Sequence, residues 1–431
     1  MTTNTTDQTK LDNAAKDSSF SLKEHFSIPP DIIYLDGNSL GPLPIASQKA
    51  VAKAVSQEWG QGLITSWNAA GWMNLPLKTG ARIARLVGAH SHEIVVADST
   101  SLNLFKVLCA ALDLQKLRAP NIQNQRTVIV SEKGNFPTDL YMVQGLNALL
   151  GNSYELRLVE RDDLLNSFDE RVAVVLLTQV DYRTGSKLDM AALTAAAQAC
   201  GCITIWDLAH SAGAFEVDLN GANADYAIGC GYKYLNGGPG APAFLFVAQR
   251  HLEFFKQPLS GWLGHAAPFE FETGYRPAPG IAAAICGSPP ILSMTALSAA
   301  LDVFDALEFF GGMKALQAKS AILCNTFIKA LAGTRLICIT PTDARLRGSQ
   351  VSFSLPDGTM AYAVVQALIA KHSEDDISVI GDFRAPNILR FGFAPLYLSV
   401  TDIELAAEKI KRVLDKSLWN QAQFLQRNAV T

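Results

Sequence analysis

From about residue 95 to residue 250, short apolar runs alternate with segments whose apolar residues recur at helical spacing. This alternation is typical of βαβ units. Most of the runs are solidly apolar, as expected of strands that are covered on both faces. The sequence therefore predicts an α/β fold with a mainly parallel central sheet and helices on both faces. The predicted strands are residues 127–131, 155–159, 172–178, 202–206, 226–229 and 243–247.

The organisation changes near residue 292. Residues 274–292 are rich in Pro and Gly, and a helical tract over 294–331, interrupted by Gly311 and Gly312, follows them. Apolar runs at 336–339, 350–354 and 388–393, with helical patterns at 362–371 and 402–415, predict a smaller C-terminal α+β domain. We predict an N-terminal arm and a segment packing on the small domain over 1–60, the large α/β domain over 61–300, and the small domain over 301–431.

Charge and hydropathy exclude several kinds of partner. The chain has 36 Lys and Arg against 40 Asp and Glu, and no stretch concentrates the basic residues as in a nucleic-acid binder. The longest apolar runs, such as 172–177, are far shorter than the ~18 residues of a bilayer span. The polar N-terminal segment does not resemble a secretory signal. We expect a cytoplasmic protein with no nucleic-acid or membrane partner.

The cysteines predict neither disulfides nor a metal site. There are seven of them, an odd number, and most have apolar neighbours. Neither C-x-x-C nor H-E-x-x-H occurs. We interpret them as reduced core residues.

Polar residues that follow the predicted strands indicate where chemistry takes place, because ligands of open α/β sheets bind outside the carboxyl ends of strands. Asp207 ends the run CITIW, His210 follows on the loop, and Lys233 comes between DYAIGCG and the Gly-rich NGGPG. Alone, an Asp at a strand end is more often a helix cap or turn former, a His is usually a satisfied loop residue, and a Lys is usually solvated. Together, a lysine able to form a Schiff base and an acid able to hold a pyridinium nitrogen predict pyridoxal phosphate as cofactor.

Two more segments fit this prediction. The sequence DSTS at 98–101 precedes a strong helical pattern, so Thr100 and Ser101 are expected at a helix N-terminus, which suits a phosphate. The alternative is an ordinary cap. Phe136 in GNFPTD offers a flat surface for a ring, or is a core side chain. The motifs of dinucleotide and nucleoside triphosphate sites are absent.

At these residues the chain resembles the kynureninases, fold-type-I pyridoxal phosphate enzymes of the class V aminotransferase group. The likeness runs over about residues 34–397. Asp207 and Lys233 at their spacing indicate only the superfamily, whereas YLDGNSLG, YKYLN and GWLGH together are much narrower. The most specific motifs are YLDGNSLGPLP at 34–44, SWNAAGW at 66–72, FPTDLY at 136–141, DLAHSAG at 207–213, YKYLNGGPG at 232–240, GWLGH at 261–265, SPPIL at 288–292 and PNILRFGFAPLY at 386–397.

The resemblance implies a role for each matched residue. Lys233 would bind the cofactor covalently, Asp207 would pair with its pyridine nitrogen, and His210 would lie beside the ring. Tyr232 would be the acid/base at the substrate carbonyl, which makes Lys233, Tyr232 and Asp207 the expected catalytic residues. The other implied cofactor contacts are Thr100, Ser101, Phe136, Pro137, Thr138, Asp139 and Thr178, together with Trp262 and Ser288, which would reach the phosphate from the neighbouring subunit of a homodimer with shared sites.

The implied substrate contacts include one departure. Arg390 matches the arginine that clamps the substrate carboxylate, a task suited to a bidentate guanidinium, and Arg384 is the competing candidate. Trp67, Gly287 and Ser288 stand where kynureninases that favour 3-hydroxykynurenine carry His, Ser and Asn. This resembles the bacterial pattern, which favours kynurenine itself.

The implied reaction is the hydrolysis of L-kynurenine to anthranilate and L-alanine, a step of tryptophan degradation and of NAD biosynthesis, with 3-hydroxykynurenine as a poorer substrate. One alternative is another class V activity such as cysteine desulfurase, which needs a nucleophilic cysteine on a mobile loop. Cys338 instead lies in LICIT, a predicted buried strand. A non-catalytic protein on the same fold would lack the lysine or its acid, and both are present.

Overall fold

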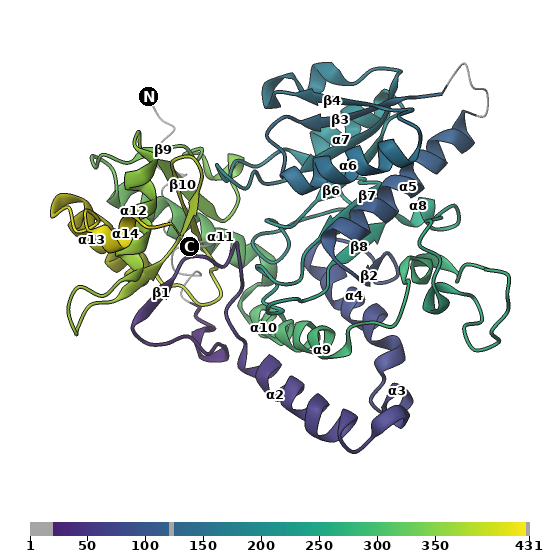
Figure 1. The fold of residues 1–431 in the computed structure, drawn as a ribbon, viewed down its shortest axis with the longest axis horizontal. Helices are drawn as coiled ribbons and strands as arrows, with labels where there is room; N and C mark the ends of the chain where they lie inside the picture. Colours follow the sequence, from purple (N-terminus) through teal and green to yellow (C-terminus); the bar gives the residue numbers. More distant parts are fainter. Residues whose placement is uncertain (1–19, 120–124, 428–431) are drawn as a thin grey trace.

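The computed structural model describes residues 20–119 and 125–427. Figure 1 shows a larger part around a seven-stranded sheet and a smaller part that contains the C-terminal helices. The strand order of the large sheet is β2-β8-β7-β6-β5-β3-β4. Its strands are β2 (Ile94–Val96), β3 (Val128–Glu132), β4 (Glu155–Val159), β5 (Val172–Thr178), β6 (Ile203–Asp207), β7 (Tyr226–Gly229) and β8 (Phe244–Val247).

This sheet is mainly parallel, which confirms the prediction. In its described part, β8 runs antiparallel to β2 and β7, and the other neighbouring pairs are parallel. Every residue of β5 is buried, which explains its solidly apolar sequence VAVVLLT. Alternate side chains of β5 enter two separate cores, with Leu177 in one and Leu176 in the other.

Helices cover both faces of the sheet, as predicted. Side chains of α4 (Leu75–Leu86) and α7 (Met190–Ala199) pack into the core that contains Leu177. Those of α5 (Thr100–Arg118) and α6 (Pro137–Leu149) pack into the core that contains Leu176. Helix α7 connects β5 to β6 and begins after Asp189, whose side chain accepts a hydrogen bond from the Ala192 amide.

The smaller part has the predicted α+β character. It contains a four-stranded antiparallel sheet of order β12-β13-β10-β9 and a parallel pair, β1-β11. The strands are β1 (Ile32–Tyr34), β9 (Ile337–Cys338), β10 (Gln350–Ser354), β11 (Ser378–Ile380), β12 (Asp382–Arg384) and β13 (Ile388–Gly392). The helices are α11 (Gly312–Ala330), α12 (Gly358–Ile369), α13 (Val400–Asp415) and α14 (Ala422–Leu425).

The prediction of a buried strand at 336–339 is wrong. The strand β9 has two residues at the edge of its sheet, Ile337 is 56% exposed, and Cys338 is half-buried. An edge strand is covered on one side only, so an apolar run does not guarantee burial. The cysteines are all free, and three of them, Cys202, Cys230 and Cys324, are buried as predicted, whereas the other four are partly exposed.

The N-terminal segment joins the two parts. Residues 1–19 of the predicted arm lie outside the described residues. From Phe20 on, the chain is packed: Phe20, Leu22 and Phe26 are buried, and β1 pairs with β11. Helix α2 (Ile45–Lys53) then packs along α9 (Ile291–Ala300) in the larger part. The domain bounds 1–60, 61–300 and 301–431 stay a prediction.

The helical tract predicted over 294–331 is three helices. They are α9, α10 (Asp302–Leu307) and α11, and Gly311, with a φ of 97°, immediately precedes the last of them. Two single-turn helices, α3 (Ser66–Ala69) and α8 (Gln249–Leu252), complete the described helices labelled α. Across residues 20–119 and 125–427, no helix has both the length and the apolarity needed to cross a bilayer.

Candidate active site

A cavity of about 590 Å³ lies at the carboxyl ends of the sheet strands. Thr178 and Asp207 end β5 and β6, and Lys233 follows β7 by four residues. The structure thus brings together residues that are far apart in the sequence, as expected for a parallel sheet. Ten predicted cofactor residues line the cavity: Thr100, Ser101, Phe136, Thr138, Asp139, Thr178, Asp207, His210, Tyr232 and Lys233.

The Lys233 amine lies in the interior of this cavity. Its Nζ is 2.9 Å from His210 Nε2 and 6.0 Å from the centroid of the Phe136 ring. Burial lowers the pKa of Lys233, and burial together with the Lys233 charge holds the pKa of His210 well below its usual range. The neutral His210 imidazole can therefore accept a hydrogen bond from the Lys233 amine.

The loop that carries Lys233 is fixed by the N-terminal segment. The Gly41 amide donates a hydrogen bond to the Tyr232 carbonyl at 2.8 Å. A Cβ on Gly41 would come within 2.4 Å of the Lys233 carbonyl oxygen, so only glycine fits this approach. Through this contact the motif YLDGNSLG, which is distant from Lys233 in the sequence, packs against the loop that carries Lys233.

Two interacting carboxyl groups, Asp139 and Asp207, line the same cavity as Lys233. Asp207 and Asp139 are both buried, and burial raises the pKa of each; the Asp207 charge raises that of Asp139 further. The Asp207 Oδ1 accepts a hydrogen bond from the Ala209 amide at 2.7 Å, and Thr178 Oγ1 donates to Asp139 Oδ2 at 3.3 Å. A cationic ring N–H beside Asp207 would compensate its buried charge.

The third feature is the start of α5. Thr100 and Ser101 are its first two residues, and the Ser99 hydroxyl accepts a hydrogen bond from the Leu102 amide at 3.3 Å. The first amides of a 19-residue helix have no partner within the helix, so they can bind an anion. Asp98, just before them, has a left-handed φ of 45° and forms an ion pair with the fully buried Lys106.

These three features fit pyridoxal phosphate. The cavity offers an amine for the aldehyde, a carboxylate for the ring nitrogen and a helix N-terminus for the phosphate, with Phe136 at its wall. The buried His210 Nδ1 and Ser211 Oγ have no hydrogen-bond partner among the described residues, so polar groups remain for a ligand. In the described residues, no group of three or more His, Cys, Asp or Glu could hold a metal ion.

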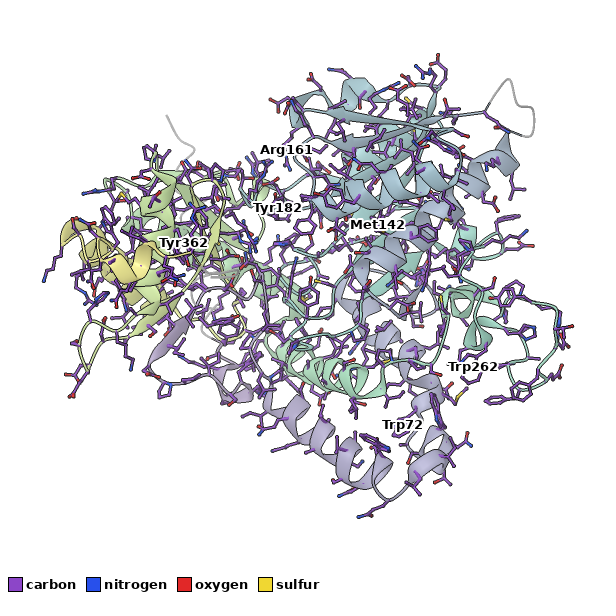
Figure 2. The ribbon with its side chains drawn as sticks, viewed as in Figure 1. Trp72, Met142, Arg161, Tyr182, Trp262 and Tyr362 are labelled. Atoms are coloured by element: carbon purple, nitrogen blue, oxygen red, sulfur yellow. The ribbon has the colours of Figure 1, made fainter. Side chains whose placement is uncertain are left out.

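Six predicted site residues do not line this cavity: Arg390, which is described below, and five others. Pro137 is the first residue of α6 and stands between Phe136 and Thr138, which both line the cavity. Trp262 is 41% exposed and packs edge-to-face on Phe269. The preceding residue, Gly261, lies against the backbone of Cys286, and Gly287 and Ser288 follow Cys286 in the sequence. Trp67 packs edge-to-face on Trp72, and Figure 2 shows Trp72 and Trp262 at the end of the larger part remote from Tyr182. The roles of Pro137, Trp67, Trp262, Gly287 and Ser288 stay predictions.

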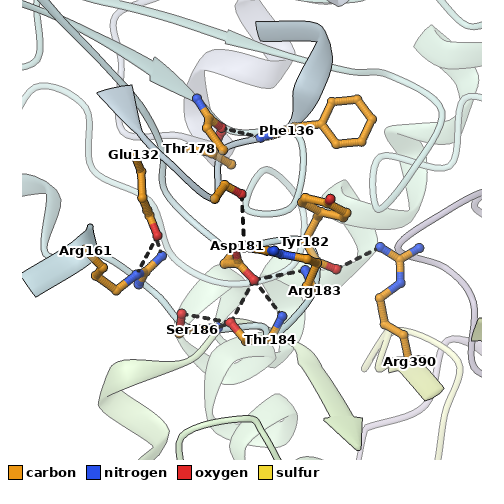
Figure 3. A network of polar contacts seen from close by, with 12 residues as sticks. Glu132, Phe136, Arg161, Thr178, Asp181, Tyr182, Arg183, Thr184, Ser186 and Arg390 are labelled. Atoms are coloured by element: carbon orange, nitrogen blue, oxygen red, sulfur yellow. Dashed lines mark hydrogen bonds and ion pairs between the residues drawn. The ribbon is translucent and has the colours of Figure 1, made fainter. Parts of the chain in front are cut away.

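Arg390 lies next to the cavity, behind Tyr182. It is buried on β13 and donates a hydrogen bond to the Tyr182 carbonyl at 3.0 Å, as Figure 3 shows. It also forms an ion pair with Asp382 and donates to Ser39 Oγ at 2.6 Å. Arg384 bonds the same Asp382 oxygen at 2.7 Å, so both candidate arginines meet at one carboxylate.

Sequence reasoning missed several lining residues. Tyr182 comes from the loop after β5, and no motif singled it out. Asp98 is in the DSTS segment, and its position after an apolar run was the available signal. Pro239 to Ala243 and Pro290 also line the cavity; the first group is part of the Gly-rich turn that the sequence shows after Lys233.

Comparison with known proteins shows which family the chain belongs to. The chain is 48% identical to a kynureninase from Pseudomonas fluorescens, and the alignment covers 97% of each protein. The chain belongs to the kynureninase family. It is also 48% identical to a kynureninase from Burkholderia mallei, and that alignment covers 95% of this chain and 96% of the relative. Residues 316–410 match the kynureninase C-terminal domain family.

Two solved structures with a similar fold have lower sequence identity to this member of the kynureninase family. An apo cysteine desulfurase from Thermococcus onnurineus NA1 matches with a TM-score of 0.72 and 18% identity, over 92% of this chain and 98% of that one. A C-DES variant with glycine covalently linked to its PLP cofactor matches with a TM-score of 0.73 and 17% identity, over 92% and 99%. At this identity the likeness shows the fold, which is the predicted fold-type-I arrangement.

Proposed function

We propose that this chain hydrolyses L-kynurenine to anthranilate and L-alanine with pyridoxal phosphate as cofactor. The observation that carries the proposal is one cavity that is lined by Lys233, its neighbour His210 and the buried Asp207, in a chain of the kynureninase family. The reaction would serve tryptophan degradation, and NAD biosynthesis where that route continues, in the cytoplasm. Incubating the purified protein with kynurenine should release anthranilate, which is followed by its fluorescence.

We assign the cofactor contacts from the geometry of the cavity. Lys233 Nζ would hold the cofactor covalently, Asp207 its ring nitrogen, and Thr100 and Ser101 at the start of α5 its phosphate. When bound, pyridoxal phosphate supplies the electron sink for a carbanion at the substrate α-carbon. Asp207 would keep its charge beside a cationic ring N–H, whereas Asp139, whose pKa is raised by burial and by the Asp207 charge, would retain a proton.

Lys233 and Tyr232 would move the protons. The lowered pKa of Lys233, caused by burial, raises the neutral fraction of its amine, so Nζ can take the proton from the substrate α-carbon. Burial raises the pKa of Tyr232, so its hydroxyl keeps a proton that it can donate to the substrate γ-carbonyl oxygen as water adds. The neutral His210 orients the Lys233 amine through their 2.9 Å contact.

Arg390 would bind the substrate carboxylate. Its guanidinium is fixed by Asp382, Ser39 and the Tyr182 carbonyl, so it is already oriented at the edge of the cavity. Arg384 is 40% exposed at its side chain and bonds the same carboxylate, so it remains the second candidate. A guanidinium that is already held in place loses less conformational entropy when it binds the carboxylate than a mobile guanidinium does.

Asp207→Asn should lower turnover at least tenfold while leaving the fold intact. The amide is of the same size but cannot hold the ring nitrogen protonated by charge, and a charge-assisted hydrogen bond is worth ~1.5–3 kcal/mol. Circular dichroism and steady-state anthranilate release measure the two effects. Asp139→Asn is the matched control, since the carboxyl of Asp139 is expected to be already protonated. Near-normal turnover of Asp207→Asn would exclude Asp207 as the ring-nitrogen partner.

We propose a homodimer with shared sites. Trp262, Phe269 and Phe271 are exposed on one loop, at 41%, 62% and 80%, and such large apolar side chains are typical of surfaces that pack against another subunit. Trp262 and Ser288 lie outside the cavity of their own chain, as expected of residues that serve the neighbouring one. Sedimentation velocity should therefore give the mass of a dimer, and a monomer at micromolar concentration would contradict the proposal.

The cysteine desulfurase alternative is disfavoured. Cys338 lies on the edge strand β9, and burial raises its pKa, so its sulfur is a thiol near neutral pH and not the thiolate that acts as nucleophile. Its Sγ donates a hydrogen bond to the Thr340 carbonyl at 3.5 Å. A non-catalytic protein is disfavoured because Lys233 and Asp207 are both present in the same cavity.

We expect kynurenine to be preferred over 3-hydroxykynurenine by about ten to a hundredfold in kcat/KM. Trp67 is bulky and apolar, and Gly287 offers no side chain, so a ring hydroxyl would be left with Ser288 as its one small polar neighbour among the three. Burying a hydroxyl without a partner costs ~1–3 kcal/mol on mutational scales. The triple variant Trp67→His, Gly287→Ser, Ser288→Asn should narrow or invert the ratio. Equal constants for both substrates on the natural protein would exclude this pocket as the source of selectivity.

A further inference from the structure

The active-site cavity carries an acid at the start of α5, where the proposed function needs an anion to bind. Among the described residues that line this cavity, Asp98, Asp139 and Asp207 are acids, and Lys233 is the one lysine or arginine. Asp98 comes just before the first residues of α5, where we place the cofactor phosphate. A carboxylate so close to a phosphate repels it unless a cation neutralises the carboxylate.

Lys106 supplies that cation. It lies two turns into α5, is fully buried and forms an ion pair with Asp98. Its Nζ also donates to the Ala284 carbonyl at 2.8 Å and to Asn103 Oδ1 at 3.3 Å. These three acceptors match the three hydrogens of the ammonium group. Lys106 does not line the cavity, so it does not itself contact a ligand there.

The backbone at Asp98 is held from two sides. Its φ of 45° is left-handed, a conformation that is uncommon outside glycine and persists where the surroundings fix it. The Asp98 carbonyl accepts a hydrogen bond at 2.8 Å from the amide of Ala243, the residue before β8. The ion pair with Lys106 holds the side chain. This turn sets the direction in which α5 begins, and with it the direction of the first free amides of the helix.

Asn103 ties the ion pair to the end of β2. The residue is fully buried, its Nδ2 donates to the Ala97 carbonyl at 2.7 Å, and its Oδ1 accepts the hydrogen bond from Lys106. Burying a charged lysine is costly unless its charge and its hydrogens have partners, and Lys106 has them. The ion pair is therefore a fixed part of the turn and not a mobile surface contact.

We propose that Lys106 is a positioning residue for the cofactor phosphate. It neutralises Asp98 and fixes the turn from which the first amides of α5 face the cavity. The inference rests on the proposed function, because it takes the start of α5 as the phosphate site. With Asp98 neutralised, the positive end of the helix attracts the phosphate without an opposing charge. Loss of the Lys106 charge should therefore weaken binding of the phosphate group and leave the covalent bond at Lys233 intact.

Titration of the full-length apoenzyme with pyridoxal phosphate and with pyridoxal tests this role. Both aldehydes can bond to Lys233, and only the first carries a phosphate, so the ratio of their dissociation constants measures the phosphate contribution. The absorbance of the lysine-bound aldehyde follows both titrations. Lys106→Met should raise the dissociation constant of pyridoxal phosphate by about tenfold or more, and that of pyridoxal by about twofold or less.

Asp98→Asn provides a rescue that a merely structural role of Lys106 would not show. Asparagine tolerates the left-handed conformation and carries no charge. The double variant Lys106→Met, Asp98→Asn should therefore bind pyridoxal phosphate about threefold or more tightly than Lys106→Met alone. Asp98→Asn alone should bind inorganic phosphate, measured by competition with pyridoxal phosphate, at least as tightly as the natural apoenzyme. This single variant decides the question if Lys106→Met does not fold.

Lys409→Met is the matched control. Lys409 is another buried lysine, 3% exposed, and it lies in the smaller part, outside the cavity. Its Nζ forms an ion pair with Asp376 at 3.1 Å and donates to the Ala370 and Ile377 carbonyls at 2.8 Å and 2.5 Å. Its loss should lower the unfolding temperature yet leave the ratio of the two dissociation constants unchanged. An equal change of that ratio in Lys409→Met and Lys106→Met would overturn the inference.

Four further outcomes would overturn it. They are unchanged affinity of Lys106→Met for pyridoxal phosphate, an equal loss of affinity for both aldehydes in that variant, a double variant that binds no more tightly than Lys106→Met, and weaker binding of inorganic phosphate by Asp98→Asn. Each of them leaves the proposed function standing. If the natural apoenzyme bound neither aldehyde, the proposed function would be rejected together with this inference.

Discussion

Lys233→Ala is expected to abolish the covalent link to the cofactor and nearly all turnover. An alanine has no amine to bind the aldehyde, and none to take the proton from the substrate α-carbon. The natural protein should absorb above about 400 nm, the range of a protonated lysine–cofactor bond, and the variant should lose this band. Borohydride reduction followed by peptide mapping identifies the modified lysine directly.

The control for this prediction is Lys233→Arg. This variant keeps a cation near His210 and the two carboxyl groups. Any loss of turnover that is due only to the missing charge should therefore be smaller in Lys233→Arg than in Lys233→Ala. Arginine cannot form the covalent bond to the cofactor, so the absorbance band above about 400 nm should be lost in both variants. Reduction that fixes the cofactor to a different lysine, such as the fully buried Lys106, would reject the assignment.

The strands of the large sheet could be predicted because burial on both faces leaves a solid apolar run. The predicted segments 155–159, 172–178 and 226–229 coincide with β4, β5 and β7. The short strands β1, β11 and β12 were missed because three residues are too few to show a periodicity. The strand at Cys338 was placed correctly but its burial was not, because position in a sheet depends on which strands pair, and this is not a local property.

The site was predictable where a strand end fixes a residue in space. Asp207 and Lys233 follow apolar runs, so a parallel sheet alone places them at one edge. Tyr182 and Asp382 could not be found this way. Tyr182 meets Arg390 through the contact between the two parts of the fold, which is set by packing between residues 208 apart in the sequence. Asp382 meets Arg390 because the short strand β12 pairs with β13, and strand pairing is not visible in so short a segment.

The electrostatics of the site also depend on tertiary structure. Asp139 is predicted from its motif, but its raised pKa arises from burial and from the Asp207 charge. The same holds for His210, whose neutral state follows from burial and from Lys233. Which groups carry protons before substrate arrives is therefore a property of the fold, and it determines which residues can act as acid or base.

Tyr232→Phe is expected to lower turnover by about 10²–10⁴-fold with the cofactor spectrum largely kept. The substitution keeps the ring, whose centroid is 5.8 Å from Lys233 Nζ, and removes only the hydroxyl. Because burial raises the pKa of this tyrosine, the hydroxyl is protonated across the neutral range, and its loss removes a proton donor, not a charge.

The order of steps provides the measurement that separates an acid/base role from a structural one. If Tyr232 acts only at the γ-carbonyl, removal of the substrate α-proton by Lys233 should proceed at its normal rate in the variant. Exchange of the α-hydrogen with deuterated water would then continue while anthranilate release falls. A variant that loses both in parallel would indicate a role in binding, and one that releases anthranilate at the natural rate would leave Tyr232 only a packing or phosphate contact. Lys233 and Tyr232 are adjacent in the chain, yet they would act on different carbons of one substrate. Comparing the rate of α-hydrogen exchange with the rate of anthranilate release therefore tests whether the two residues have separate roles.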